Sequence, residues 1–190
     1  MKTYDFVHLV IHAAGDSVQG RTKLQKLVYF VGALMGRLER LGFRAHYYGP
    51  YSPDVAGAVQ ELRGLKFLQQ HAVSFGTTDR SGFEFNRYDY SLTKEGKEMA
   101  YEKASIYPDE WILIEKAVQK INSTNTQDYV RLAIAAKTHL LSRQNSKGLS
   151  AQELETKTAE HGWSAFTPAQ YLEALEFLNR VGLSPREVNS

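Results

Sequence analysis

The chain has 190 residues, of which 43% are hydrophobic, and a formal net charge of +2 at pH 7. That length can bury one good core or two small ones, and no apolar run approaches the roughly 18 residues that a membrane-spanning helix needs. The lack of cysteine excludes disulfides, thiolate nucleophiles and Cys-ligated zinc. We therefore expect a cytoplasmic protein without an export signal or a membrane contact, and the small charge does not by itself indicate nucleic acid.

The first part of the chain predicts two helices. Apolar residues at helical spacing predict a helix from Tyr4 to Ala14, and the segment from Gly15 to Gly20 is expected to turn. A second, longer helix is expected from Thr22 to Gly42, because Thr22 and Gln25 have capping-box spacing and glycine favours a helix end. Lys26 falls opposite the apolar face of this helix and is expected to be exposed.

The next segments predict a third helix and a β hairpin. A short strand from Phe43 carries Tyr47 and Tyr48, Gly49-Pro50 turns the chain, and Ser52 caps a helix that ends near Gly64. By chain order this is the recognition helix of a helix-turn-helix. Two wing strands follow, joined by a polar turn over residues 77–82, and their alternation breaks near Arg87, which allows a bulge or register shift. The strands are expected over Leu65–Phe75 and Phe83–Ser91.

The stretch YDYSLTKEGKEMA, from Tyr88 to Ala100, joins a polar-aromatic strand directly to a helix that Thr93 can cap. Such a join is typical of winged helix-turn-helix domains, in which the second wing strand leads into a closing helix. We therefore predict a mainly α fold. A winged helix-turn-helix domain with a small β wing covers residues 1–105 and packs on a helical C-terminal domain over residues 106–190.

The chain beyond Thr93 predicts helices almost throughout, with breaks at Pro108, Asn122–Asn125 and Ser142–Gly148. Ser150 with Glu153, and Thr167 with Gln170, are capping boxes for two last helices that end at Gly162 and Gly182. Ser52-Pro53 and Thr167-Pro168 each open a helix that ends at a Gly-Leu pair. The C-terminal region is therefore either a second helix-turn-helix formed by duplication or an ordinary pair of capped helices. The last residues, SPREVNS, are expected to fray.

Two motifs in the first half carry a family resemblance. KLQKLVYFVG, from Lys23 to Gly32, and YYGPYSPDV, from Tyr47 to Val55, with a later EL.GL, resemble the YwgA-type family of uncharacterised bacterial and archaeal proteins. AKTHLL, GW and EALEFLNRVGL resemble the tail of that group. More distantly, KLQKL and YGP are similar to the Panacea domain of antitoxins in toxin–antitoxin operons. The resemblance implies a winged-helix-like fold and a non-enzymatic binding role, and it implies no particular ligand.

Basic residues indicate one candidate function, that of a DNA-binding transcriptional regulator. Residues 1–105 hold 14 Lys and Arg against 11 Asp and Glu, whereas the rest holds 9 against 10. Phosphate contacts are expected near the second helix, groove contacts from the recognition helix, and a further contact at the wing tip. The candidate residues for duplex DNA are Arg21, Lys23, Lys26, Arg44, Gln60, Arg63, Lys66, Arg80 and Arg87. The alternative interpretation is an ordinary solvated charged face.

Two acids on the predicted recognition helix, Asp54 and Glu61, oppose DNA binding, because phosphate neutralisation supplies most of the affinity. The alternative function is therefore a protein-interaction module, antitoxin-like or an adaptor, with a partner such as a toxin. Its candidate contacts are Tyr47, Tyr48, Tyr51, Asp54 and Glu61. The other interpretation of the tyrosines is that they brace the turn before the recognition helix. A homodimer is compatible with either function.

Nothing in the sequence indicates an enzyme. Ser-His-Asp spacing, a phosphate-cradling glycine loop and a nucleotide fingerprint are all missing. His8 and His12 share a helix face, but HLVIH lacks the glutamate of HExxH and a nearby third ligand. We expect no catalytic residues, no bound metal and no cofactor.

Overall fold

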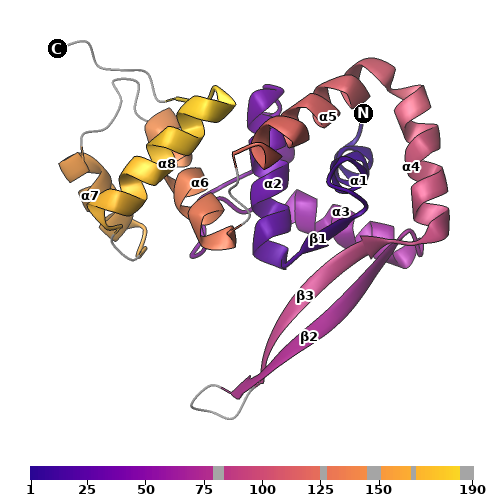
Figure 1. Cartoon of the computed structure of the whole chain (residues 1–190), viewed down its shortest axis with the longest axis horizontal. Helices are drawn as coiled ribbons and strands as arrows, with labels where there is room; N and C mark the ends of the chain where they lie inside the picture. The colour runs from indigo at the N-terminus through magenta and orange to yellow at the C-terminus, as the bar shows by residue number, and fades with distance from the viewer. Residues whose placement is uncertain (79–83, 125–127, 145–150, 164–165, 185–190) are drawn as a thin grey trace.

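The computed structural model describes residues 1–78, 84–124, 128–144, 151–163 and 166–184. These form a mainly helical body with a small antiparallel sheet, which confirms the predicted mainly α class (Figure 1). In chain order the elements are α1 (Thr3–Ala13), β1 (Ser17–Gln19), α2 (Arg21–Leu34), the 3₁₀ helix η1 (Leu38–Leu41), α3 (Pro53–Gly64), β2 (Leu68–Thr78), β3 (Glu84–Leu92), α4 (Lys94–Ile106), α5 (Pro108–Asn122), α6 (Tyr129–Gln144), α7 (Ala151–Glu160) and α8 (Pro168–Val181).

The start of α2 differs from its sequence prediction. The segment predicted as a turn contains β1, because Val18 is buried in the core and the strand pairs with β3. Gly20, with φ of 90°, is the N-cap of α2 and provides no side-chain cap. The predicted capping box of Thr22 and Gln25 is therefore wrong, and Gln25 has other partners.

The end of α2 also differs. The helix stops at Leu34, and η1 follows as a separate turn before Gly42, which has the predicted left-handed conformation. The prediction of a continuous helix to Gly42 is wrong, because the chain turns at Gly36, with φ of 65°, and brings Leu41 back against α2. A β-carbon at Gly32 would lie 2.5 Å from a methyl carbon of Leu41. The glycine thus leaves room for η1 to pack on the helix.

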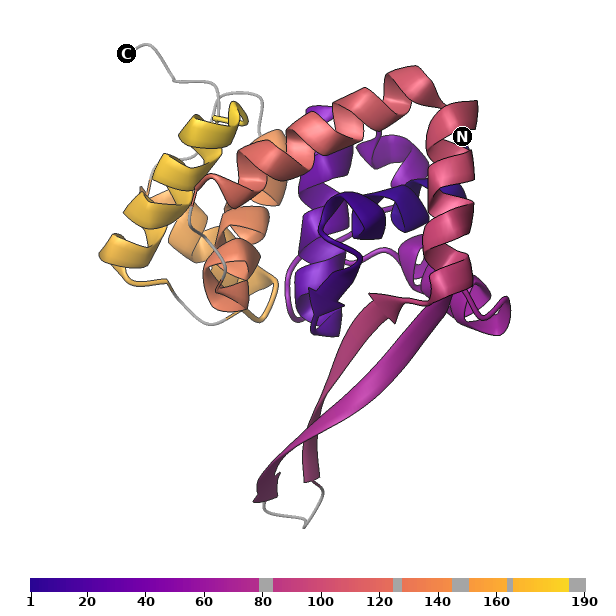
Figure 2. The ribbon, with the colours of Figure 1, turned by 45° about the vertical axis from the view of Figure 1, so that its right-hand side comes forward.

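The sheet has the strand order β1-β3-β2 and is antiparallel throughout. Val18 and Gln70 both pair with Tyr90, so β3 is the central strand at the body. Beyond that point β2 and β3 continue as a two-stranded ribbon that projects from the helices in both views (Figures 1 and 2). A register shift between Ser74 and Thr78 confirms the irregularity predicted in this region. Residues 79–82 of the predicted turn lie outside the described residues, whereas Thr77 and Thr78 belong to β2 and not to a turn.

The later helix boundaries follow the predicted capping signals. Thr93 caps α4 by accepting a hydrogen bond from the Gly96 amide at 2.9 Å. Pro108 opens α5, and Thr167 and Gln170 form the predicted capping box of α8, which ends at the left-handed Gly182. The capping box of Ser150 and the tail from residue 185 lie outside the described residues.

The main apolar core joins both halves of the chain. Its buried members include Phe6 of α1, Phe30 of α2, Leu62 of α3, Ile114 of α5 and Phe177 of α8. A smaller cluster connects α6 to the segment around α7; it consists of Leu140, Leu141, Leu154 and Trp163. The division into domains at residue 105, and the second helix-turn-helix, stay predictions.

Candidate nucleic-acid interface

The KLQKL motif holds the start of α3 in place. Gln25 of α2 is buried, and its side-chain amide donates to the Ser52 carbonyl at 3.1 Å and accepts from the Ser52 amide at 3.0 Å. Ser52 in turn caps α3, because its hydroxyl accepts from the Val55 amide at 3.0 Å and donates to the Leu41 carbonyl. The motif and the YSP segment, 27 residues apart, thus form one hydrogen-bonded unit that fixes α3 on α2.

Lys26 is buried, so its predicted exposure and its role as a phosphate contact are wrong. Its ammonium donates to the Pro50 carbonyl at 2.6 Å, in the turn that precedes α3. Burial, and then the nearby charge of Lys137, lower the pKa of Lys26 to about 7. Helical spacing did not predict this burial because the segment before α3 covers the polar side of α2.

Residues 44–51 form a tight hairpin, which we call the tyrosine hairpin. Its turn lies at Tyr47 and Tyr48, so the prediction of a strand that carries both tyrosines is wrong. Arg44 and Tyr51 exchange backbone hydrogen bonds, and His46 and Gly49 do the same around the two tip residues. The tip residues, Tyr47 and Tyr48, are 65% and 62% exposed, and their rings meet edge to face at 4.9 Å. Of the predicted partner-binding tyrosines, these two therefore face solvent, whereas Tyr51 is half-buried beside the ring of His46.

The C-terminal helices brace the tyrosine hairpin. The Trp163 indole N–H donates to the His46 carbonyl at 2.7 Å. Lys137 of α6 lies over the Trp163 ring at 5.0 Å, and its side chain also borders Gly49. Sequence reasoning did not select Trp163 or Lys137, although both belong to the GW and AKTHLL segments that carry the family resemblance. Lys26 donates to the Pro50 carbonyl and Trp163 donates to the His46 carbonyl. These two contacts hold the hairpin that carries Tyr47 and Tyr48 in position.

A second group of predicted residues gathers where the ribbon leaves the body. The Arg21 guanidinium lies 4.1 Å from the centre of the Tyr88 ring on β3. Burial raises the pKa of Tyr90, against the opposing effects of a hydrogen bond with Arg21 and of the charges on Arg21 and Arg63. Arg63 lies in the last turn of α3, which leads into β2.

Arg87 completes this group, and we call Arg21, Arg63 and Arg87 the ribbon-root arginines. The Arg87 side chain passes Gly20, with its Cδ 3.8 Å from the place where a β-carbon of that glycine would be. Its guanidinium forms a two-point contact with Asp89, at 2.7 and 2.9 Å. This pairing compensates much of the charge of Arg87.

The remaining candidates are distributed over different surfaces. Gln60, Asp54 and Glu61 are exposed on α3, and Arg63 donates to Gln60 at 2.7 Å. Lys66 is exposed between α3 and β2. Lys23 is half-buried in the first turn of α2, and Arg44 lies on the tyrosine hairpin. Arg80 lies outside the described residues.

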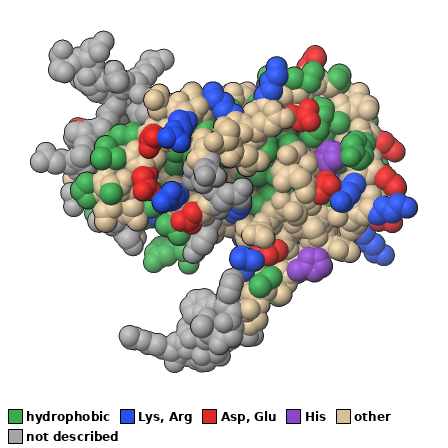
Figure 3. Space-filling model, in the orientation of Figure 1, with side chains coloured by type: hydrophobic (Ala, Val, Ile, Leu, Met, Phe, Trp, Pro, Cys, Tyr) green, Lys and Arg blue, Asp and Glu red, His purple; other side chains and the backbone are tan. Residues whose placement is uncertain are grey.

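Charges on the visible face of the molecule are mixed. In Figure 3, Lys and Arg side chains alternate with Asp and Glu side chains over the helices and beside the ribbon. The face drawn there shows no continuous basic surface among the described residues. A DNA contact on this side would therefore depend on a few individual arginines and not on a broad basic surface.

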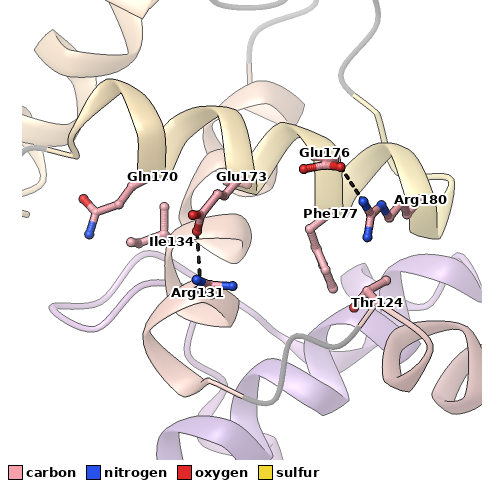
Figure 4. Close-up of a pocket in the computed structure, with 9 residues that line it drawn as sticks. Thr124, Arg131, Ile134, Gln170, Glu173, Glu176, Phe177 and Arg180 are labelled. Carbon is pink, nitrogen blue, oxygen red and sulfur yellow. Dashed lines mark hydrogen bonds and ion pairs between the residues drawn. The ribbon is translucent and has the colours of Figure 1, made fainter.

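A cavity of about 100 Å³ between α6 and α8 carries charged walls (Figure 4). Arg131 lies 3.3 Å from Glu173, and Arg180 is paired with Glu176. Phe177 and Ile134 line the space between these pairs. Because each arginine faces a carboxylate of its own, the walls carry compensated charge.

The two histidines considered for a metal have other partners. His8 is buried, and its Nε2–H donates to the Gly96 carbonyl at 2.9 Å. His12 donates to the Asp16 carboxylate at 2.7 Å. Within the described ranges, no cluster of three or more His, Asp or Glu side chains is arranged to bind a metal ion. The described helices are also too short or too polar to cross a membrane.

Comparison with known proteins gives a partial relative. No family profile matches the chain. Over 87 residues the chain is 36% identical to the uncharacterized protein YwgA of Bacillus subtilis (strain 168). The match covers 45% of this chain and 47% of YwgA, so the chain spans about half the length of that relative. The chain is therefore a partial homologue of YwgA.

Proposed function

We propose that this protein is a winged-helix regulator that binds duplex DNA through α3 and the ribbon-root arginines. The observation that carries the proposal is the position of the Arg21 guanidinium, 4.1 Å from the centre of the Tyr88 ring, at the point where the β2–β3 ribbon leaves the body. A cation of α2 is thereby held beside a projecting two-stranded ribbon.

The arrangement of elements supports this proposal. The order is helix, strand, two helices and two strands, and the first strand pairs with the last. Winged-helix domains have this order, with the third helix as the reading helix and the hairpin as the wing. α3 suits such a role because Gly57 and Gly64 have open space around them, so a duplex could approach its backbone closely.

The charges of α3 set the expected strength of binding. Asp54 and Glu61 are exposed on the helix that would enter the groove, and each opposes phosphate. Few phosphates would be neutralised, so we expect weak binding to random duplex with a shallow dependence on salt. Arg63 and Gln60 remain as base-edge donors, which act once the correct sequence is present.

The experiment is fluorescence anisotropy of a random-sequence duplex of about 30 base pairs with the full chain at several salt concentrations. The test variant is Arg21→Gln/Arg63→Gln, and the matched control is Lys116→Gln/Lys120→Gln, which removes the same charge from the exposed face of α5. We expect the test variant to bind about tenfold more weakly at low salt, with a log–log salt slope shallower by roughly 1 to 2 units.

The control variant should bind within about twofold of the parent, because its lysines lie away from the ribbon. Equal weakening in both variants would show a general charge effect and contradict the proposed interface. A parent protein without salt-dependent duplex binding would contradict DNA binding itself.

The tyrosine hairpin favours a second candidate function, the binding of a partner protein. Exposed tyrosines on a rigid support are typical of interface hot spots, because little side-chain entropy is lost on binding. Tyr47 and Tyr48 are held in this way by the backbone hydrogen bonds of the hairpin and by the contact with Trp163. They lie on a different segment from the ribbon-root arginines.

A pull-down with the full chain from cells that express it tests this candidate. Tyr47→Ala/Tyr48→Ala should lose a stoichiometric partner that Tyr101→Ala, with an equally exposed tyrosine on α4, retains. Retention of the partner by the double variant, or recovery of nucleic acid alone, would contradict a protein-binding hairpin.

A further inference from the structure

Two lysines from different helices converge on the turn of the tyrosine hairpin. Lys26 of α2 is buried, and its side-chain nitrogen donates to the Pro50 carbonyl at 2.6 Å. A β-carbon at Gly49 would lie 3.5 Å from Cε of Lys26 and 2.9 Å from Cγ of Lys137 on α6. The hairpin therefore lies directly on the two lysine side chains.

Neither lysine has a carboxylate partner among the described residues. No ion pair there includes Lys26 or Lys137. Lys137 instead lies over the rings of Trp163 and Phe166, at 5.0 and 5.6 Å. Burial of an ammonium without an anion is costly, whereas a neutral amine at Lys26 still donates to the Pro50 carbonyl. The closed hairpin therefore favours an uncharged Lys26.

The helices around Lys26 supply no negative charge to it. Burial, and then the like charge of Lys137 on α6, lower the pKa of Lys26 to about 7. One turn along α2 lies Tyr29, whose hydroxyl is paired with His139 of α6. Burial raises the pKa of Tyr29, so this hydroxyl stays neutral.

The hairpin and the start of α3 supply none either. The hairpin carries basic and aromatic side chains but no carboxylate; these are Arg44, His46, Tyr47, Tyr48 and Tyr51. Asp54 of α3 is exposed, and its carboxylate lies against Gly42. A proton on Lys26 is therefore buried without compensation for as long as the hairpin stays closed.

We propose that the tyrosine hairpin is a pH-dependent latch, which is closed on Lys26 while that amine is neutral and is released when the amine is protonated. Release lets the ammonium reach water, and it also breaks the contact between the Trp163 indole and the His46 carbonyl. The latch is independent of whether the chain binds DNA or a partner protein.

The direction of the response follows from proton linkage. The closed state holds Lys26 with a pKa of about 7, and the released state restores the ordinary value of 10.5. Between these values the released state binds the extra proton, so closure strengthens as the pH rises, by up to about tenfold per pH unit. Closure is lost again as the pH falls from 10.5 towards 7.

The test is hydrogen exchange of the full chain by NMR at pH 7 and pH 9, corrected for the intrinsic exchange rates. The amides of Gly49 and Tyr51 and the Trp163 indole N–H report closure, because all three donate to hairpin carbonyls. We expect their protection factors to rise by roughly 50-fold between the two pH values. The Gly96 amide, which Thr93 holds at the start of α4, should change by less than about twofold.

Two variants assign the response to Lys26. Lys26→Met keeps an apolar stem without a charge, so hairpin protection should become independent of pH. His46→Gln removes the titratable ring of the hairpin and should keep the response of the parent. A titration of the parent followed at the ¹³Cε signal of Lys26 needs no variant, and it should show a midpoint well below 10.5.

Four outcomes would overturn the proposal. The first is equal hairpin protection at pH 7 and pH 9 in the parent, and the second is an undiminished response in Lys26→Met. The third is loss of the response in His46→Gln, which would assign it to the histidine. The fourth is an equal change at the Gly96 amide, which would show a general loosening of the fold.

Discussion

Gly96 lies so close to Phe67 that a β-carbon at position 96 would be 2.0 Å from the Phe67 carbonyl oxygen. The glycine belongs to the first turn of α4, and Phe67 lies just before β2. The Gly96 carbonyl also accepts a hydrogen bond from His8 of α1. The join between ribbon, α4 and α1 therefore depends on the lack of a side chain at this residue.

Gly96→Ala should destabilise the protein by at least about 2 kcal/mol, because the backbone of Phe67 cannot move aside as a flexible side chain could. Gly57→Ala is the matched control: that glycine also lies inside a helix but has open space around it. The control should stabilise by about 0.5 to 1 kcal/mol through helix propensity. Urea unfolding of both variants measures the difference, and equal effects would contradict the close packing.

Gln25→Ala should cost about 2 to 4 kcal/mol of unfolding free energy, because it leaves the buried amide of Ser52 without an acceptor and leaves the Ser52 carbonyl with the Ala56 amide as its donor. Gln119→Ala removes an exposed glutamine from a helix of similar length and should change stability by less than about 0.5 kcal/mol. Hydrogen exchange gives a more specific measurement: the amides of α3 should exchange faster in Gln25→Ala than in the parent. Unchanged protection of α3 would show that Gln25 does not hold it.

Lys26→Met should remove a pH dependence of stability. The folded pKa of Lys26 is about 7 and the ordinary value is 10.5, so between these values the unfolded chain holds a proton that the folded chain lacks. Stability from this residue therefore rises with pH in that window, by up to roughly 1.4 kcal/mol per pH unit. The comparison is urea unfolding at pH 7 to 9 for the parent, Lys26→Met and Lys94→Met, an exposed control. An unchanged slope in Lys26→Met would contradict a neutral buried amine.

His8 and His139 should destabilise the fold in acid. Burial, followed by the charges of Lys103 and Arg143 respectively, lowers both pKa values from 6.5 to about 4. Between pH 6.5 and 4 the unfolded chain binds protons that the folded chain does not, so stability falls as pH falls. Each histidine contributes a slope of up to roughly 1.4 kcal/mol per pH unit.

His139→Gln measures one of these contributions. His139 Nδ1 lies 2.8 Å from the buried Tyr29 hydroxyl, and the glutamine amide can keep a hydrogen-bonding partner there. The variant should reduce the loss of stability between pH 6.5 and pH 5, whereas His71→Gln, at an exposed residue of β2, should not. An equal acid response in all three proteins would contradict the buried neutral histidine.

Local signals predicted most of the helix boundaries. Ser52, Thr93 and Thr167 cap the helices that they were expected to cap, because a cap requires only a side-chain oxygen and an amide three residues later. The alternating tyrosines of β3 similarly indicated a strand. Both signals depend on neighbours within a few residues, which the sequence contains.

Other features depended on contacts between distant residues. Helical spacing predicts that Lys26 is exposed, yet the residue is buried. Its ammonium donates to the Pro50 carbonyl, and the charge of Lys137 lies near it. Gln25 has the spacing of a capping box, yet its partner is Ser52. β1 was missed because three residues carry little alternation, and pairing with β3 decides their conformation.

The sequence by itself determined the mainly α class and the caps at Ser52, Thr93 and Thr167, because short-range backbone chemistry governs them. Only the tertiary structure decided that the KLQKL motif is a support for α3 and that Arg21 of α2 lies against the Tyr88 ring of β3. The physical reason is that burial and charge proximity depend on which segments cover one another, and helical spacing alone does not specify the covering segment.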